Sequence, residues 1–154
     1  MSSPRVLPVL LLLAGASPVS SAAVDAARAV PIVSWSLTGA LGYADIHHLL
    51  FADGTYLLVD HGVLALEAHV EGDLVGAMLD AIRGSGFPEE WTEEPPRPAP
   101  TEILVTISVL GGAASYSYLL GTTPKLPEGV ATVERVFLRI LNAVLASSSW
   151  IGGP

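Results

Sequence analysis

The chain contains no cysteine, few positively charged residues and no apolar run long enough to cross a membrane. Without cysteine it has no disulfide, no thiol nucleophile and no lipoprotein-type attachment, so its stability has to come from a packed core. Lys and Arg number seven against 15 Asp and Glu, which gives a formal net charge of −8. Because nucleic acids and anionic lipids repel such a chain, we expect neither as a partner.

The most continuous apolar run lies at the N-terminus and has the order of a signal peptide. Arg5 supplies a short positive region, Val6 to Ala14 are apolar, and Ser17 to Ala23 are small and polar apart from one proline and one valine. We expect cleavage after Ala22 and a secreted or periplasmic protein. A retained anchor needs roughly 20 apolar residues, whereas this run is about half as long and is broken by Pro8, so we expect no stable membrane anchor.

The rest of the chain has the length of one ordinary domain, which can fold without disulfides. We expect a flexible lead-in at 23–30, a single globular domain at 31–146 and a flexible, Ser- and Gly-rich tail at 147–154.

Two β-hairpins are predicted from alternating apolar residues. In the first, strands at 45–52 and 55–60 flank Asp53-Gly54, a pair that favours a two-residue type I′ turn. That turn would place His48 opposite Val59 and His47 opposite Asp60. The second hairpin pairs 103–109 with 115–120 around Gly111-Gly112, and further strands are predicted at 31–38 and 63–70.

Two helices complete the predicted elements. Apolar residues recur at helical spacing from Glu71 to the stop at Gly84, and again from about Glu128 to Ala146. The proline-rich segment 87–100 between them is expected to be a surface loop. The order predicts an α+β fold with a mostly antiparallel sheet of about five to six strands and both helices packed on it.

This order of elements resembles the emfourin-like family, small bacterial inhibitors of thermolysin-type (M4) metalloproteases. The corresponding stretches are Leu37-Thr38-Gly39-Ala40-Leu41-Gly42, Ala52-Asp53-Gly54, Gly84-Ser85-Gly86-Phe87, the loop to Pro100 and the strands from Glu102. This chain departs from the family's Gly-rich S-G-G-x-x-G turn, because it has Thr38-Gly39 where two glycines are usual. The resemblance implies a protease inhibitor, but no inhibitory residue is carried over, and a shared fold does not guarantee a shared function.

Four histidines lie within 23 residues of one another: His47, His48, His61 and His69. The expected register makes His48 and His61 diagonal neighbours, with Asp45 and Glu67 as the nearest acids. Zinc requires three or four converging ligands, and no spacing such as H-E-x-x-H is present. We therefore expect no metal site, with His48 and His61 as the best candidates for one, and a cross-strand pair of His47 with Asp60.

No catalytic or cofactor motif stands out. Ser85 lies between two glycines after a helix, whereas a nucleophile elbow requires a strand before the serine and a helix after it. Gly111-Gly112 lacks the lysine of a phosphate-binding loop. We expect no enzymatic activity and no cofactor.

The loop before Pro100 carries the candidate partner-binding residues Glu89, Glu90, Trp91, Glu93 and Glu94, since acidic groups around an aromatic can contact a basic or metal-bearing partner. A solvated, proline-stiffened crossover is the simpler explanation of these residues. The leading hypothesis is an exported, non-enzymatic binding protein, and specifically an inhibitor of a thermolysin-type protease. The alternatives are a small exported metal-dependent enzyme or metal-binding protein that uses the four histidines, and an accessory envelope domain.

Overall fold

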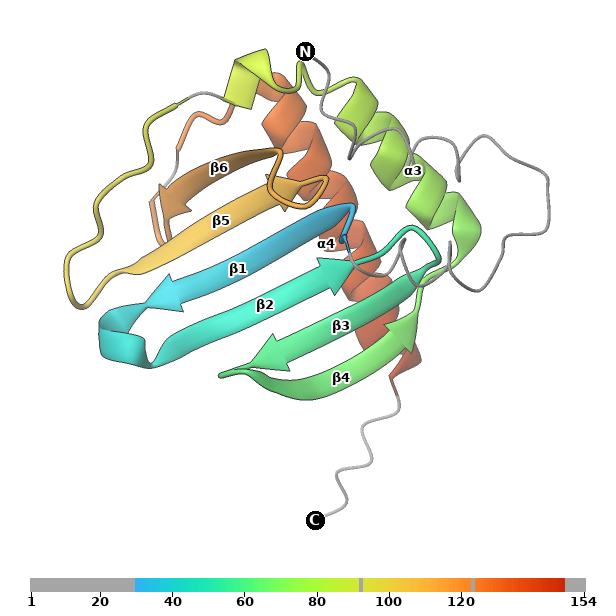
Figure 1. Ribbon diagram of the computed structural model, residues 1–154, viewed down its shortest axis with the longest axis horizontal. Coiled ribbons are helices and arrows are strands. Elements are labelled where there is room, and N and C mark those ends of the chain that lie inside the picture. The colour runs from blue at the N-terminus through green and yellow to red at the C-terminus, as the bar shows by residue number, and fades with distance from the viewer. Residues whose placement is uncertain (1–29, 92, 123, 149–154) are drawn as a thin grey trace.

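A six-stranded sheet, antiparallel throughout, forms the centre of the protein in a computed structural model that describes residues 30–91, 93–122 and 124–148. The order of strands across the sheet is β4-β3-β2-β1-β5-β6 (Figure 1). The strands are β1 (Val33–Gly39), β2 (Ala44–Leu50), β3 (Thr55–Asp60), β4 (Val63–His69), β5 (Ile103–Val109) and β6 (Ala114–Leu119). The predicted α+β class and its hairpins are confirmed.

Two α-helices pack against this sheet. Helix α4 (Glu128–Ser147) crosses one face of the sheet, and α3 (Gly72–Arg83) packs on α4 along the end of the sheet where β1 begins (Figure 1). Asp73 in the first turn of α3 and Arg83 in its last turn both complement the helix dipole. Neither helix of the described ranges is long and apolar enough to span a bilayer.

The core lies between the sheet and α4. Every second residue of β5 is fully buried, namely Val105, Ile107 and Val109, because strand side chains alternate between the two faces. From α4, Phe137 is fully buried and stacks on Trp35 of β1, with ring centroids 5.8 Å apart. Burying such a ring contributes roughly 1.5–3 kcal/mol.

The end of the sheet next to α3 is tightly closed. A Cβ atom placed on Gly129, at the start of α4, would lie 2.0 Å from the backbone oxygen of Ser85. Ser85 is fully buried, and its hydroxyl donates to the carbonyl of Ile82 at 2.7 Å and accepts from the indole of Trp91 at 3.2 Å. Ser85 is thus part of the packing where α3 ends.

The predicted register of the first hairpin is wrong by one residue. The structure pairs Leu50 with Tyr56 and His48 with Leu58. The connection is a three-residue loop closed by the bond from the Phe51 N–H to the Thr55 carbonyl at 2.9 Å. Only Gly54 in this loop has positive φ, as in a type I turn followed by a bulge, whereas a type I′ turn needs two such residues.

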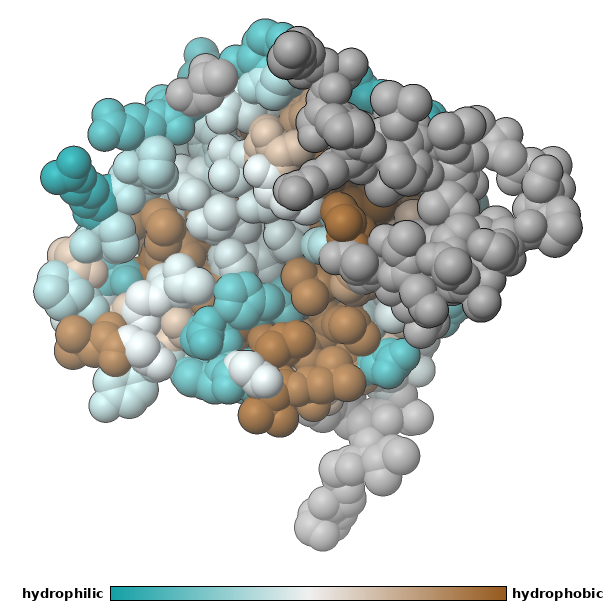
Figure 2. All heavy atoms as spheres, viewed as in Figure 1, coloured by the Kyte–Doolittle hydropathy of each residue, from teal (hydrophilic) through white to brown (hydrophobic). Residues whose placement is uncertain are grey.

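The sheet face opposite α4 is not covered by any described element, and its two halves differ. Strands β1, β5 and β6 present hydroxyl side chains there, Ser34, Ser36, Thr38, Thr106, Ser108, Ser115 and Ser117. Strands β2 to β4 present Leu49, Leu57, Val59 and Leu64 beside His47. Figure 2 shows this contrast as pale side chains over β1 and β5 and brown ones over β3 and β4.

Several predictions on the chain ends fall outside the described residues. The signal peptide, all of the lead-in except Val30 and residues 149–154 of the tail belong to this group. Helix α4 continues through Ser147, one residue beyond its predicted end.

Candidate functional site

At the end of the sheet far from α3, the connection between β1 and β2 has an unusual backbone. Gly39 to Gly42 form the short helix η1 (Ala40–Gly42) and its entry, and four consecutive residues have positive φ. Glycine is required at the first position, because a Cβ on Gly39 would lie 2.5 Å from the oxygen of Glu102. Ala40 and Leu41 have φ of 49° and 59°, which costs non-glycine residues free energy and is most often seen at functional sites.

The turn between β3 and β4 lies against this connection. His61 and Gly62 both have positive φ, as a two-residue type I′ hairpin turn requires. The N–H of His61 donates to the carbonyl of Asp45 at 2.8 Å, which ties the turn to the start of β2. The I′ turn expected at Asp53-Gly54 is therefore found one hairpin later.

The ring of His61 joins the two turns. Its Nε2 lies 2.9 Å from the carbonyl oxygen of Gly42 and its Nδ1 lies 2.6 Å from a carboxylate oxygen of Asp60. Both partners are acceptors, so both ring nitrogens have to donate, and the geometry fits the charged imidazolium. The pKa of His61 is raised above its ordinary value. The largest cause is the hydrogen bond to the Gly42 carbonyl, and the next is the hydrogen bond to the Asp60 carboxylate.

Large apolar side chains are exposed at this same end of the sheet. The exposed fractions are 74% for Leu41, 85% for Tyr43, 67% for Val63 and 52% for Leu64. We call these four residues and the two turns that carry them the apolar tip. Figure 2 shows brown side chains over η1 and over the strands that lead to the second turn. Hydrophilic side chains lie between these two brown groups, so the apolar tip presents two exposed apolar groups at one end of the sheet.

The charge of the surrounding region has one sign. From Val30 through Ile82, which covers β1 to β4 and nearly all of α3, there is no Lys or Arg. The same stretch carries Asp45, Asp53, Asp60, Glu67, Glu71, Asp73 and Asp80. The apolar tip therefore lies in a negative electrostatic field, which favours the approach of a positively charged surface.

The four histidines lie in four different environments. His47 on the open face pairs with Asp45 at 2.7 Å, whereas the sequence predicted Asp60 as its partner. His48 points into the core and its Nδ1 lies 2.5 Å from the hydroxyl of Tyr56. His61 is in the apolar tip, and His69 lies at the opposite end of β4.

The expected neighbourhood of His48 and His61 is thus wrong, because the one-residue register shift pairs His48 with Leu58 and removes His61 from the face that His48 shares with Tyr56 and Leu58. Burial, and to a lesser degree the nearby His47, lowers the pKa of His48. Over the described ranges, no three His, Asp or Glu side chains come together in a way that could hold a metal ion.

The acidic loop is anchored by its aromatic residue. Trp91 is only 3% exposed at the end of the short helix η2 (Glu89–Trp91), so its indole belongs to the core and is not accessible to a partner in this conformation. Glu89, Glu90, Glu93 and Glu94 are exposed. Glu93 accepts a hydrogen bond from Tyr116, which raises the pKa of that tyrosine to about 12. A partner role of the exposed glutamates stays a prediction.

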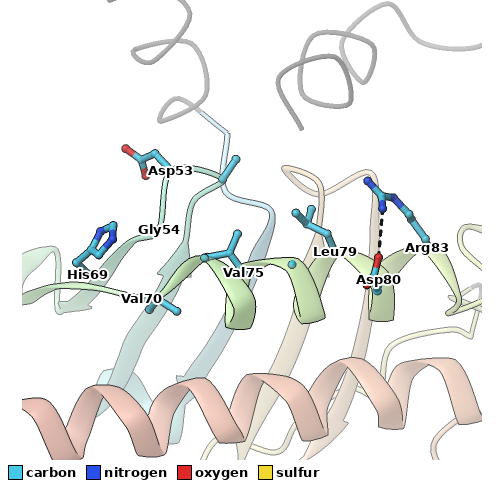
Figure 3. A pocket seen from close by; sticks show the side chains of 11 residues that line it. Asp53, Gly54, His69, Val70, Val75, Leu79, Asp80 and Arg83 are labelled. Atoms are coloured by element: carbon cyan, nitrogen blue, oxygen red, sulfur yellow. Dashed lines mark hydrogen bonds and ion pairs between the residues drawn. The ribbon is translucent and has the colours of Figure 1, made fainter. Parts of the chain in front are cut away.

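A shallow hollow lies at the other end of the sheet, between α3 and the β2–β3 turn (Figure 3). Its volume is about 380 Å³, and Val75 and Leu79 point toward it from α3. Asp80 and Arg83 on its border bind each other at 3.2 Å, and His69 lies away from them. These charged groups do not converge, so the hollow has little to orient a ligand.

The sequence reasoning missed the apolar tip. Its signal was present, since Leu41, Tyr43, Val63 and Leu64 directly flank Gly42 and Gly62 in segments expected to turn. No model of a known protein family matches the chain, and no curated protein sequence matches it either.

Proposed function

We propose that the protein is an exported binding protein that recognises another exported protein through the apolar tip. The observation that carries this proposal is the exposure of Leu41, Tyr43, Val63 and Leu64 at one end of the sheet. Folding would ordinarily bury such side chains, and each buried one contributes roughly 1.5–3 kcal/mol. A partner surface that covers them supplies the same gain on binding.

The rigidity of the tip supports this function. The first turn is held by the bond from the Ala40 N–H to the Glu102 carbonyl at 2.9 Å, and the second by its bond to Asp45. His61 fastens the two turns to each other. A surface that is ordered before binding loses less conformational entropy when the complex forms, and it therefore binds more tightly.

We further propose that the partner is a thermolysin-type metalloprotease and that binding inhibits it. The support is the resemblance to the emfourin-like inhibitors. The stretch from Leu37 to Gly42, which corresponds to the Gly-rich turn of that family, is the one that forms η1 and carries Leu41. An inhibitor needs no catalytic group of its own, only a surface that blocks access to the protease.

The test is the residual activity of a panel of thermolysin-type proteases after incubation with excess protein. We expect inhibition of at least one protease, and a loss of about tenfold or more in inhibitory strength for the double variant Leu41→Ser, Tyr43→Ser. Leu145→Ser is the matched control, because Leu145 is 44% exposed on α4 and remote from the tip. It should inhibit as the unaltered protein does.

Unchanged activity across the whole panel would refute the inhibitor proposal. The broader binding function is tested separately by capture of partners from the exported fraction with the unaltered protein and with the double variant. A protein that the unaltered chain captures and the double variant does not is the expected result. Equal capture by both would remove the apolar tip from the proposal.

A further inference from the structure

The two edges of the sheet differ in how well they are protected. At one edge, the outer side of β6 is bordered by the proline-rich segment that follows η2. Glu93, Glu94 and Pro96 of that segment line a hollow of about 260 Å³ together with Tyr116 to Leu119 and Pro124. A strand added at β6 would have to displace this segment.

At the other edge, β4 has no described neighbour on its outer side. Its sequence, Val-Leu-Ala-Leu-Glu-Ala-His, contains no proline, lysine or arginine, the residues that natural sheets commonly use to keep other strands from pairing. One irregularity lies near its start, where Ala65 is an extra residue in the pairing with β3. From Leu66 to His69 the pairing with β3 is regular, so the outer N–H and C=O groups there are arranged to pair with another strand.

The chemistry around this edge selects a partner by charge and by side-chain type. Glu67 is exposed in the middle of β4, and Glu71 is exposed two residues after the strand ends. Val63 and Leu64 at the start of β4 are exposed and belong to the apolar tip. A second copy of this chain would bring like charges together, whereas a cationic strand with apolar side chains would complement both features.

We propose that β4 is the docking edge for an extended segment of the partner protein in which lysine or arginine alternates with apolar residues. The segment extends the sheet to a seventh strand through backbone hydrogen bonds, and its cationic side chains face Glu67 and Glu71. This inference rests on the proposed binding function, since it names the part of the partner that pairs with β4 beside the apolar tip. The negative field described above brings the segment to the edge, and the backbone pairing holds it there.

The test uses a fluorescently labelled peptide of alternating lysine and valine, as long as the seven residues of β4, and measures its anisotropy on titration with the full chain. We expect saturable binding that weakens as salt is added. A peptide N-methylated at alternate residues, which has lost the donors for the ladder, should bind about tenfold more weakly or worse. An alternating glutamate and valine peptide should not bind.

The edges are compared by matched variants. Glu67→Lys replaces the negative charge in the middle of β4 with a positive one, leaves the apolar tip unaltered, and should weaken binding of the lysine and valine peptide by about tenfold or more. Ser115→Lys with Ser117→Lys makes the same change of charge on β6 and should leave binding within about twofold. Circular dichroism before the titration verifies that both variants are folded.

Three results would overturn the inference: no binding, equal binding of the N-methylated peptide, or equal loss in the β6 variant. A dimer of the unaltered protein in sedimentation velocity that the β4 variant abolishes would also overturn it, because a second copy would then occupy this edge. The proposed function can fail separately. If the peptide binds and no protease is inhibited, only the inhibitor proposal is refuted. If the double variant Leu41→Ser, Tyr43→Ser no longer captures a partner but the β4 variant still does, only the β4 inference is refuted.

Discussion

The two ends of the sheet are built in opposite ways. Where α3 ends, Ser85 and Trp91 are buried and bonded to each other, and a Cβ on Gly129 would find no room, whereas the hollow described above lies farther along α3. At the apolar tip, large side chains are exposed and the strain of positive φ falls on Ala40 and Leu41. The difference suggests that stability is concentrated at one end, which leaves the other free to be shaped by binding.

The largest effect on this comparison is expected from Gly129→Ala at the closed end. The new Cβ would lie 2.0 Å from the Ser85 oxygen, so the start of α4 or the end of α3 has to move. We expect a loss of about 3 kcal/mol or more in the free energy of unfolding, measured by urea titration. Gly76→Ala is the matched control, since a Cβ there meets nothing within 4 Å and alanine favours a helix by roughly 0.5–1 kcal/mol. Equal stability of both variants would contradict the close packing at Gly129.

The next largest effect on stability is expected from replacing Trp91, which anchors the acidic loop. Trp91→Ala creates a cavity and removes the indole N–H that donates to the Ser85 hydroxyl. We expect a loss of about 3 kcal/mol in the free energy of unfolding. The same measurement on Glu90→Ala, an exposed neighbour, should stay within about 0.5 kcal/mol. A Trp91→Ala protein of unaltered stability would mean that the loop is not fastened to the core by this residue.

A smaller effect is expected on the way the free energy of unfolding falls in acid. The pKa of His48 is lowered in the folded state, so the unfolded chain binds a proton more readily. The stability that neutral His48 provides is complete above the ordinary value of 6.5 and is lost as the pH falls below 6.5 through the lowered pKa. We expect the free energy of unfolding to fall less between pH 7.5 and pH 5 in His48→Gln than in the unaltered protein. A pH dependence unchanged by the substitution would show that His48 does not contribute to it.

His61 should respond with the opposite sign, because its pKa is raised. Its bonds to Gly42 and Asp60 are present below 6.5 and are lost as the pH rises through the raised pKa. The His61 side chain is exposed to solvent, so the readout is local. We expect hydrogen exchange at the His61 turn to accelerate, beyond the intrinsic effect of pH, above that pKa, and His61→Asn to abolish the added acceleration.

The smallest effect on stability is expected from the apolar tip itself. Leu41→Ser and Tyr43→Ser should each change the free energy of unfolding by no more than about 0.5 kcal/mol, because both side chains lie in solvent. The same urea titration measures this. A loss of 2 kcal/mol or more would show that the tip contributes to the core and would weaken the contrast between the two ends.

The elements of the fold were predictable because each has a periodicity of its own. The apolar stripe of α4 and the alternation in β5 need no tertiary information to be recognised. The register of the first hairpin did need it. Asp53-Gly54 is compatible with a two-residue turn and with a three-residue loop that has only Gly54 at positive φ, and this choice decides which side chains of β3 share a face with His48.

The candidate site was less predictable for a related reason. The apolar tip consists of two turns that are separated in the sequence, and they meet only because β1 to β4 form a meander that returns to the same end. The bond between His61 and Gly42 spans 19 positions and has no local sequence signal. The burial of Trp91, likewise, depends on Ser85 and on the core cluster around it, which the loop's composition does not reveal.

The absence of Lys and Arg from Val30 through Ile82 has a consequence for proteolysis of the protein. Proteases that cut after basic residues find no peptide bond to hydrolyse anywhere in the meander or in α3 before Arg83. Both turns of the apolar tip and the whole of β4 lie within this stretch. The part of the chain that we propose to meet a partner is therefore also the part that a trypsin-like enzyme leaves in one piece.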